Sequence, residues 1–231
     1  MNQMYKIAGG VGVLILVLWL LLRGGENATV IKAVPERPVA DSTGYTIISF
    51  GDSLTAGFGL PTHEAYPAQL EKVLKADGYA VTIINAGVSG ETTRGNLERA
   101  AFIRKQNPDI VILGIGGNDA LRLLPLSDTK KNLEETITTL KSGGNAPVIA
   151  LLEMQAPLTA GLAYKREFDA MYEEFAAEYG LLLVPFLTTD LFFDSKNKLS
   201  DGIHYNQVGY AKAVEQHIAP VIREVLDKFR E

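Results

Sequence analysis

The sequence predicts a three-layer α/β/α sandwich, in which helices cover both faces of a five-stranded parallel sheet of flavodoxin-like order. Five short apolar runs alternate along the chain with amphipathic, helix-like segments. The runs are nearly continuous in apolar residues, which is typical of strands buried on both faces. Strands that alternate with helices favour right-handed crossovers and therefore a parallel sheet.

The first half of this domain begins with a strand over residues 46–50, which stops at Gly51 before a turn that carries Ser53. Glycine after a run of strand formers indicates a tight turn. The pattern then predicts a helix from Pro67 to Gly78, a strand over 80–85, a helix over 92–106 and a strand over 110–113. Proline is favoured in the first turn of a helix and glycine just past its end, which sets these bounds.

The second half continues the alternation. It contains a helix before Gly143, a strand over 148–152, a helix from about Tyr164 to Tyr179, a strand over 181–186 and a final helix from Asn206. Aromatic residues recur at helical spacing between Tyr164 and Tyr179, and we interpret this stripe as facing the core. Pro220 must kink or interrupt the final helix, because proline removes a backbone donor.

The amino terminus contains an uncharged apolar run over residues 7–22, between Lys6 and Arg23. As a helix it would span about 24 Å, slightly less than a hydrocarbon core of roughly 30 Å. No small-residue cleavage pattern follows the run, so we expect residues 1–23 to form an uncleaved signal anchor in preference to a removed signal peptide. Residues 24–43 are rich in turn-forming and polar residues and are interpreted as a linker to the domain at 44–231.

The composition and charge of the chain argue against several classes of function. The formal net charge is −5 without a run of basic residues, which argues against a nucleic-acid partner. The absence of cysteine excludes disulfides and cysteine-ligated zinc. The three histidines, at 63, 204 and 217, lack the spacing of a metal site, so we expect no metal and no other cofactor.

Polar groups follow three of the predicted strands, at Ser53, Gly87 and Asn118. The carboxyl ends of parallel strands meet at one edge of the sheet, where ligands bind. Near the carboxyl terminus Asp201 precedes His204 by three residues, a spacing that lets the carboxylate accept from one imidazole nitrogen. The other nitrogen is then free to act as a base toward Ser53, which is the set of groups that acyl transfer requires.

Four blocks of the sequence resemble the SGNH (GDSL) hydrolases, and in particular the bacterial arylesterase and thioesterase I–lysophospholipase branch. The blocks are Gly-Asp-Ser-Leu at 51–54, Asn-Ala-Gly-Val-Ser-Gly at 85–90, Gly-Gly-Asn-Asp at 116–119 and Asp-Gly-Ile-His at 201–204. The resemblance implies Ser53 as nucleophile, His204 as general base and Asp201 as its orienting partner. It also implies an oxyanion hole made by the backbone N–H groups of Ser53 and Gly87 and the side-chain amide of Asn118.

The implied activity is hydrolysis of carboxylic esters or thioesters, with a small ester or acyl compound as partner. Together with the apolar run at 7–22, it implies a periplasmic domain anchored to the inner membrane, or a periplasmic or secreted one after cleavage. The sequence leaves the oligomeric state open. Two residues depart from the family pattern, because Tyr205 stands where many relatives have proline and Glu91 where aspartate is usual. Neither is expected to touch a catalytic atom. Asp52 and Asp119 are interpreted as structural residues that hold their own turns.

Two other functions fit parts of the pattern. A carbohydrate or cell-wall O-acetylesterase would use the same triad on a different substrate. A nucleotide- or solute-binding module would use the same sheet, but Gly114-x-Gly116-x-x-Asp119 lacks the third glycine of the dinucleotide fingerprint. Such a module would also have no use for an Asp201–His204 pair. The Gly-x-Ser-x-Gly elbow of α/β-hydrolases is absent, because the stretch that begins at Gly87 ends in Glu91.

Overall fold

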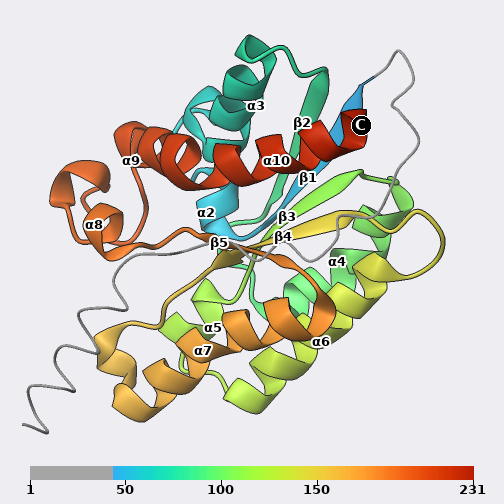
Figure 1. Ribbon diagram of the computed structural model, residues 1–231. Helices are drawn as coiled ribbons and strands as arrows, with labels where there is room; N and C mark the ends of the chain where they lie inside the picture. Colours follow the sequence, from blue (N-terminus) through green and yellow to red (C-terminus); the bar gives the residue numbers. More distant parts are fainter. Residues whose placement is uncertain (1–43) are drawn as a thin grey trace, which may run out of the picture. The chain divides into compact units, whose positions relative to one another are not determined.

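The computed structural model describes residues 44–231 (Figure 1). The predicted anchor at 1–23 and the predicted linker at 24–43 lie outside the described residues. Within the described range, none of the helices combines the length and the apolar character needed to span a bilayer.

The five strands form one parallel sheet in the order β2-β1-β3-β4-β5, which confirms the predicted flavodoxin-like arrangement. The strands are β1 (Tyr45–Gly51), β2 (Val81–Gly87), β3 (Ile110–Gly114), β4 (Val148–Glu153) and β5 (Leu182–Pro185). The carboxyl ends of β1, β2 and β3 lie in register at Gly51, Gly87 and Gly114. This places the polar turns after these strands side by side.

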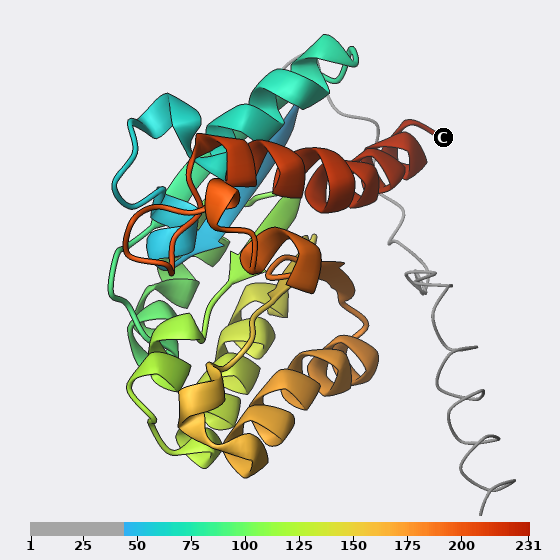
Figure 2. The same cartoon turned by 90° about the vertical axis from the view of Figure 1, so that its left-hand side faces the viewer.

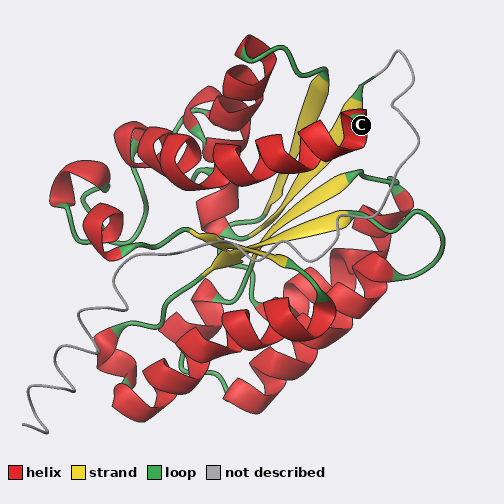
Figure 3. Cartoon of the chain, in the orientation of Figure 1, coloured by secondary structure: helices red, strands yellow, loops and turns green. Residues whose placement is uncertain are grey.

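Helices cover both faces of the sheet (Figures 1 and 3). One layer consists of α3 (Tyr66–Ala76), α9 (Gln207–Ala213) and α10 (Ala219–Arg230), and the other of α4 (Thr93–Lys105), α6 (Leu126–Lys141) and α7 (Leu162–Tyr179). Figure 2 shows the two layers on opposite sides of the strands. The aromatic stripe of α7 faces the core as predicted, since Phe168, Met171 and Phe175 are buried.

The carboxyl-terminal helix is interrupted where Pro220 requires it. A π-helical segment, Val214–Ile218, joins α9 to α10, and Pro220 lies in the first turn of α10. Because proline has no N–H and its ring crowds the preceding turn, a wider helical turn before it removes the conflict.

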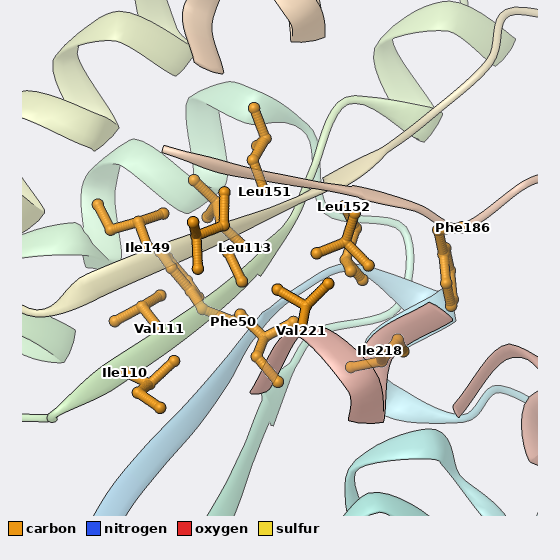
Figure 4. Close-up of a cluster of buried hydrophobic side chains, with 14 of the residues drawn as sticks. Phe50, Ile110, Val111, Leu113, Ile149, Leu151, Leu152, Phe186, Ile218 and Val221 are labelled. Atoms are coloured by element: carbon orange, nitrogen blue, oxygen red, sulfur yellow. The ribbon is translucent and has the colours of Figure 1, made fainter. Parts of the chain in front are cut away.

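The core lies between the sheet and both helical layers. Figure 4 shows strand residues such as Phe50 and Leu113 packed with Ile218 and Val221, which come from the carboxyl-terminal helical segments. Phe50, Leu113 and Ile218 are fully buried. A core of this kind holds the strand ends rigidly, so the loops after them start from fixed positions.

Short segments occupy the carboxyl edge of the sheet. They are α2 (Ser53–Ala56), η1 (Thr62–Glu64), α5 (Gly117–Leu121), η2 (Leu158–Ala160), α8 (Thr189–Phe192) and η3 (Ser195–Asn197). Ser53 begins α2 and Asn118 lies in α5, so two of the polar residues picked out by the sequence come from these segments.

Candidate active site

Ser53 is held at the carboxyl edge of the sheet by the cap of α2. The Asp52 side chain accepts a hydrogen bond from the Leu54 N–H at 3.0 Å, and its backbone N–H donates to the Gly114 carbonyl at 3.3 Å. These bonds confirm the structural role predicted for Asp52, and they fix the residue before Ser53 to the strand beside it. The Ser53 N–H has no acceptor among the described residues.

The loop that follows η3 carries Asp201 and His204. One oxygen of Asp201 accepts the backbone N–H groups of Ile203 at 2.8 Å and His204 at 3.0 Å. The other lies 2.7 Å from Nδ1 of His204. Partial burial opposes ionisation of Asp201, but the hydrogen bonds from His204 and Ile203 outweigh it and lower the pKa of this carboxyl to about 2.

His204 joins this loop to α2 across the edge of the sheet. Its Nε2 lies 2.8 Å from Oγ of Ser53, although the two residues are 151 positions apart in the chain. With Nδ1 protonated and donating to Asp201, Nε2 is left as the acceptor for the Ser53 hydroxyl. The structure therefore brings together the three residues that the sequence picked out for a triad.

Asn118 lies in α5 and reaches the turn after β2. Its Nδ2 donates to the Glu91 carbonyl at 3.0 Å and makes a longer contact of 3.4 Å with a carboxylate oxygen of Asp52. Because Asp52 is next to Ser53, these contacts place the Asn118 amide beside the start of α2. They also correct one expectation, since Glu91 does contact a residue predicted to take part in the reaction.

The structure gives the Gly87 N–H an acceptor within the chain, which argues against the oxyanion role predicted for this residue. The Gly87 N–H donates to Oδ1 of Asn85 at 3.0 Å, so a substrate oxygen would have to compete with this bond. A side chain at Gly87 would begin 2.2 Å from the backbone nitrogen of Ala56. Glycine is required here because β2 and α2 approach each other closely, and not because its N–H is presented to a ligand.

Gly90 offers a further backbone donor, which the sequence pattern did not indicate. It lies in a turn closed by a hydrogen bond from the Glu91 N–H to the Val88 carbonyl at 3.2 Å, and its φ of 81° is in the region that favours glycine. No acceptor for its N–H is found within residues 44–231. The Ser-Gly pair at 89–90 could have signalled this turn.

A salt bridge holds the turn after β2. The Glu91 carboxylate accepts hydrogen bonds from Asn96 at 2.8 Å and from two nitrogens of Arg99. The same guanidinium donates twice to the Ala86 carbonyl at 3.1 Å and lies 4.8 Å from the centre of the Phe50 ring. Arg99 therefore ties the Glu91 side of the turn to the end of β2 and to the core.

Two buried carboxyl groups lie beneath the site. Burial raises the pKa of Asp52 to about 6, against the lowering effects of the Leu54 N–H and of the nearby His204. Asp119 accepts from the Thr93 N–H at 2.9 Å and the Thr93 hydroxyl at 2.6 Å. Asp119 therefore links α5 to the start of α4, instead of holding its own turn as predicted.

The other two histidines lie away from Ser53. The side chain of His63 is 79% exposed. His217 lies in the π-helical segment, and burial lowers the pKa of its imidazole. Within residues 44–231, neither makes a hydrogen bond or an ion pair with Ser53 or Asp201.

Comparisons with known proteins show which family this chain resembles. Residues 49–212 match the GDSL-like Lipase/Acylhydrolase family. The chain is 29% identical to the thioesterase 1/protease 1/lysophospholipase L1 of Escherichia coli (strain K12), over 70% of this chain and 76% of that protein. It is 30% identical to an arylesterase of Vibrio mimicus, over 71% of this chain and 82% of the relative.

A solved structure supports the same relationship. The crystal structure of TesA superposes with a TM-score of 0.72 at 29% identity, covering 78% of this chain and 99% of the other. Ser53, Asn118 and His204 all lie within the range 49–212 that matches the family.

Proposed function

Because this chain belongs to the GDSL-like Lipase/Acylhydrolase family and is therefore an esterase-type hydrolase, we propose that it hydrolyses carboxylic esters and thioesters through Ser53, His204 and Asp201. The observation that carries the proposal is the continuous hydrogen-bonded path from Ser53 Oγ through the His204 ring to Asp201, with distances of 2.8 and 2.7 Å. A hydroxyl, a base and an orienting carboxylate in this order form the arrangement that acyl transfer uses.

In the proposed reaction, Oγ of Ser53 attacks the carbonyl carbon of the substrate while its proton moves to Nε2 of His204. The tetrahedral intermediate collapses, and the leaving alcohol or thiol takes the proton from His204. This leaves an acyl group on Ser53. Water, deprotonated by His204, then attacks the acyl carbonyl and forms a second tetrahedral intermediate. When this intermediate collapses, the bond to Ser53 Oγ breaks, Oγ takes the proton back from His204, and a carboxylic acid is released. Asp201 stays ionised throughout and stabilises the protonated imidazole.

The oxyanion of the intermediate needs donors that are free or easily freed. The N–H groups of Ser53 and Gly90 have no acceptor in the part of the chain that the structure describes. The Asn118 amide is fixed by its bond to the Glu91 carbonyl, and its weaker 3.4 Å contact with Asp52 can be exchanged for a substrate oxygen. We therefore propose Ser53, Gly90 and Asn118 as the three donors.

An acyl-chain substrate is favoured by the apolar surface near the site. Leu121, Leu123, Leu158 and Leu162 are between 49% and 79% exposed. They belong to the segments that follow β3 and β4, and the Tyr164 hydroxyl joins these segments by donating to the Leu124 carbonyl at 3.1 Å. Water contact with four leucines is unfavourable, so an acyl chain that covers them would gain binding free energy. This supports an arylesterase, acyl thioesterase or lysophospholipase over an O-acetylesterase.

The test compares the full-length protein with its Ser53→Ala variant on nitrophenyl esters from acetyl to palmitoyl at pH 8. We expect the variant to lose essentially all activity and the wild-type rate to peak beyond acetyl. Activity confined to acetyl esters, together with release of acetate from acetylated glycans, would replace this proposal by the O-acetylesterase. A folded wild type that hydrolyses none of the esters would contradict the esterase assignment for simple substrates.

A further inference from the structure

The backbone around His204 is shaped mainly by its own neighbours. The Leu199 N–H donates to the His204 carbonyl at 2.9 Å, and the Asn206 N–H donates to the Asn197 carbonyl at 2.9 Å. These bonds connect residues within ten positions of one another, so they define the form of the loop. They do not fix the loop relative to α2, which lies far away in the sequence. Another contact must set the position of His204 relative to Ser53.

Tyr205, the residue after His204, docks the loop on the core. Its side chain is fully buried, and its hydroxyl donates to the Phe186 carbonyl at 2.9 Å. Its ring meets those of Phe186 and Tyr210 edge to face, with centroids 5.7 and 5.6 Å apart. The loop is therefore fixed on the core by the burial of a large side chain.

Tyr210 continues the connection to the nucleophile. It is fully buried in α9, and its hydroxyl donates to the Leu54 carbonyl at 2.8 Å. Leu54 follows Ser53 in α2, a helix of only four residues. Figure 2 shows the orange segment before α9 beside the blue segment that contains α2. One hydrogen bond on a helix this short is a large part of what holds it.

A third tyrosine completes the cluster. Tyr66 is fully buried in α3, and its ring lies 6.2 Å from that of Tyr210 and 5.7 Å from that of Phe186. Its hydroxyl is 3.5 Å from the Thr55 hydroxyl in α2. Tyr66 thus packs against the Tyr210 ring and, through the Thr55 hydroxyl, also lies against α2.

We propose that Tyr205 and Tyr210 are positioning residues that hold His204 at bonding distance from Ser53. Tyr205 is joined to His204 by the chain, its ring packs on Tyr210, and the Tyr210 hydroxyl bonds the residue next to Ser53. Neither tyrosine touches the reacting atoms. Burial raises the pKa of both hydroxyls above the ordinary tyrosine value, so they remain protonated donors over the working range of an esterase.

The inference rests on the proposed esterase function, and the experiment separates the two. The full-length protein is compared with Tyr205→Phe, Tyr210→Phe and the double variant. Each substitution removes a single oxygen and keeps the ring. The matched control is Tyr45→Phe, because the Tyr45 hydroxyl is also buried and donates to a backbone carbonyl, that of Phe229, at 3.1 Å. Tyr45 begins β1, at the end of the sheet opposite Ser53.

The measurements are kcat and KM on a nitrophenyl ester, the rate at which a nitrophenyl phosphonate labels Ser53, and thermal unfolding. We expect kcat and the labelling rate to fall by about tenfold or more in each Tyr variant with KM nearly unchanged, because small displacements of reacting groups are costly. The double variant should lose less than the product of the single losses, since both residues act along one path. Tyr45→Phe should lower the unfolding temperature without changing kcat.

Three results would overturn the inference. The first is that both single variants keep the wild-type kcat while their unfolding temperatures fall as in the control, which would show a structural role only. The second is a rise in KM with kcat unchanged, which would place the tyrosines in substrate recognition. The third is a folded wild type that neither hydrolyses esters nor reacts with the phosphonate, which would remove the proposed function as well. If Tyr205→Phe does not fold, the kcat and labelling rate of Tyr210→Phe alone test the inference.

Discussion

The ring of Phe58 lies against the imidazole of His204, with centroids 4.6 Å apart and planes inclined by 35°. Phe58 directly follows α2 and its C-cap Gly57, and its N–H donates to the Ser53 carbonyl at 3.0 Å. Its side chain is 48% exposed, so it covers one face of the imidazole and still meets solvent. The nucleophile segment therefore contacts the base both through Oγ of Ser53 and through this ring.

We expect Phe58→Ala to lower kcat/KM by about two- to twelvefold, since an aromatic pair contributes roughly 0.5–1.5 kcal/mol. The loss should arise because the imidazole gains rotational freedom and contact with water. Phe193→Ala is the control, because Phe193 is 63% exposed and contacts Phe192 instead of a site residue. Equal kinetics for the two variants would show that the Phe58 ring does not support His204.

Asn118→Ala should lower kcat by about 10²–10³, or roughly 2.7–4 kcal/mol of transition-state stabilisation, because it removes one oxyanion donor. The unfolding temperature should change little. Asn132→Ala provides the comparison, since its amide donates to the Thr93 hydroxyl at 3.3 Å and not to the turn at Glu91. A wild-type kcat in Asn118→Ala would exclude this amide from the oxyanion hole.

Asp201→Asn should lower kcat by up to about 10⁴ at neutral pH, because an amide no longer selects the imidazole tautomer that accepts from Ser53. The pKa of Asp201 is about 2, so this carboxyl stays ionised down to acid pH. Protonation of Asp201 should therefore not contribute to any fall of wild-type kcat/KM between neutral and mildly acidic pH. Rates of the wild type and the variant measured over pH 4–9 test this, and equal kcat values at neutral pH would contradict the role of Asp201.

The raised pKa of Asp52 predicts that the free energy of unfolding depends on pH. Its folded pKa of about 6 is above the unfolded value of 3.8, so the folded protein binds more protons between these values and stability falls as pH rises through them. The full loss is about 3 kcal/mol, from roughly 1.4 kcal/mol per pKa unit. Thermal unfolding of wild type and Asp52→Asn from pH 3 to pH 7 measures it. The variant should gain stability relative to wild type as pH rises, and a constant difference would refute the raised pKa.

Arg99→Met should lower both stability and kcat, because it frees the turn to which Asn118 is bonded. Loss of a partly buried, hydrogen-bonded charge pair costs about 2 kcal/mol or more. Arg94→Met, on the same helix, is the matched control, because the side chains of Arg94 and Glu98 are 71% and 64% exposed. An exposed pair contributes less than about 1 kcal/mol. A kcat for Arg99→Met equal to that of the control would show that the turn keeps its form without the salt bridge.

Much of the site could be predicted because its chemistry is local in sequence. Asp201 and His204 are three residues apart, so one turn pairs them whatever the rest of the chain does. Ser53 and Asn118 follow apolar strands, and the carboxyl ends of parallel strands meet at one edge of the sheet. The alternation of apolar runs and amphipathic helices was enough to predict that sheet and its order.

Only the tertiary structure determines which hydrogen-bond partner each backbone group has. Gly87 and Gly90 are both glycines in one turn region, and only the folded chain shows that the first N–H bonds Asn85 while the second has no acceptor in residues 44–231. The path from Tyr205 through Tyr210 to the Leu54 carbonyl likewise joins residues more than 150 positions apart. The spacing of apolar residues along the chain predicts which side chains are buried. Which donor meets which acceptor depends on the distances between elements after they pack, and packing sets these distances only when the whole sheet is assembled.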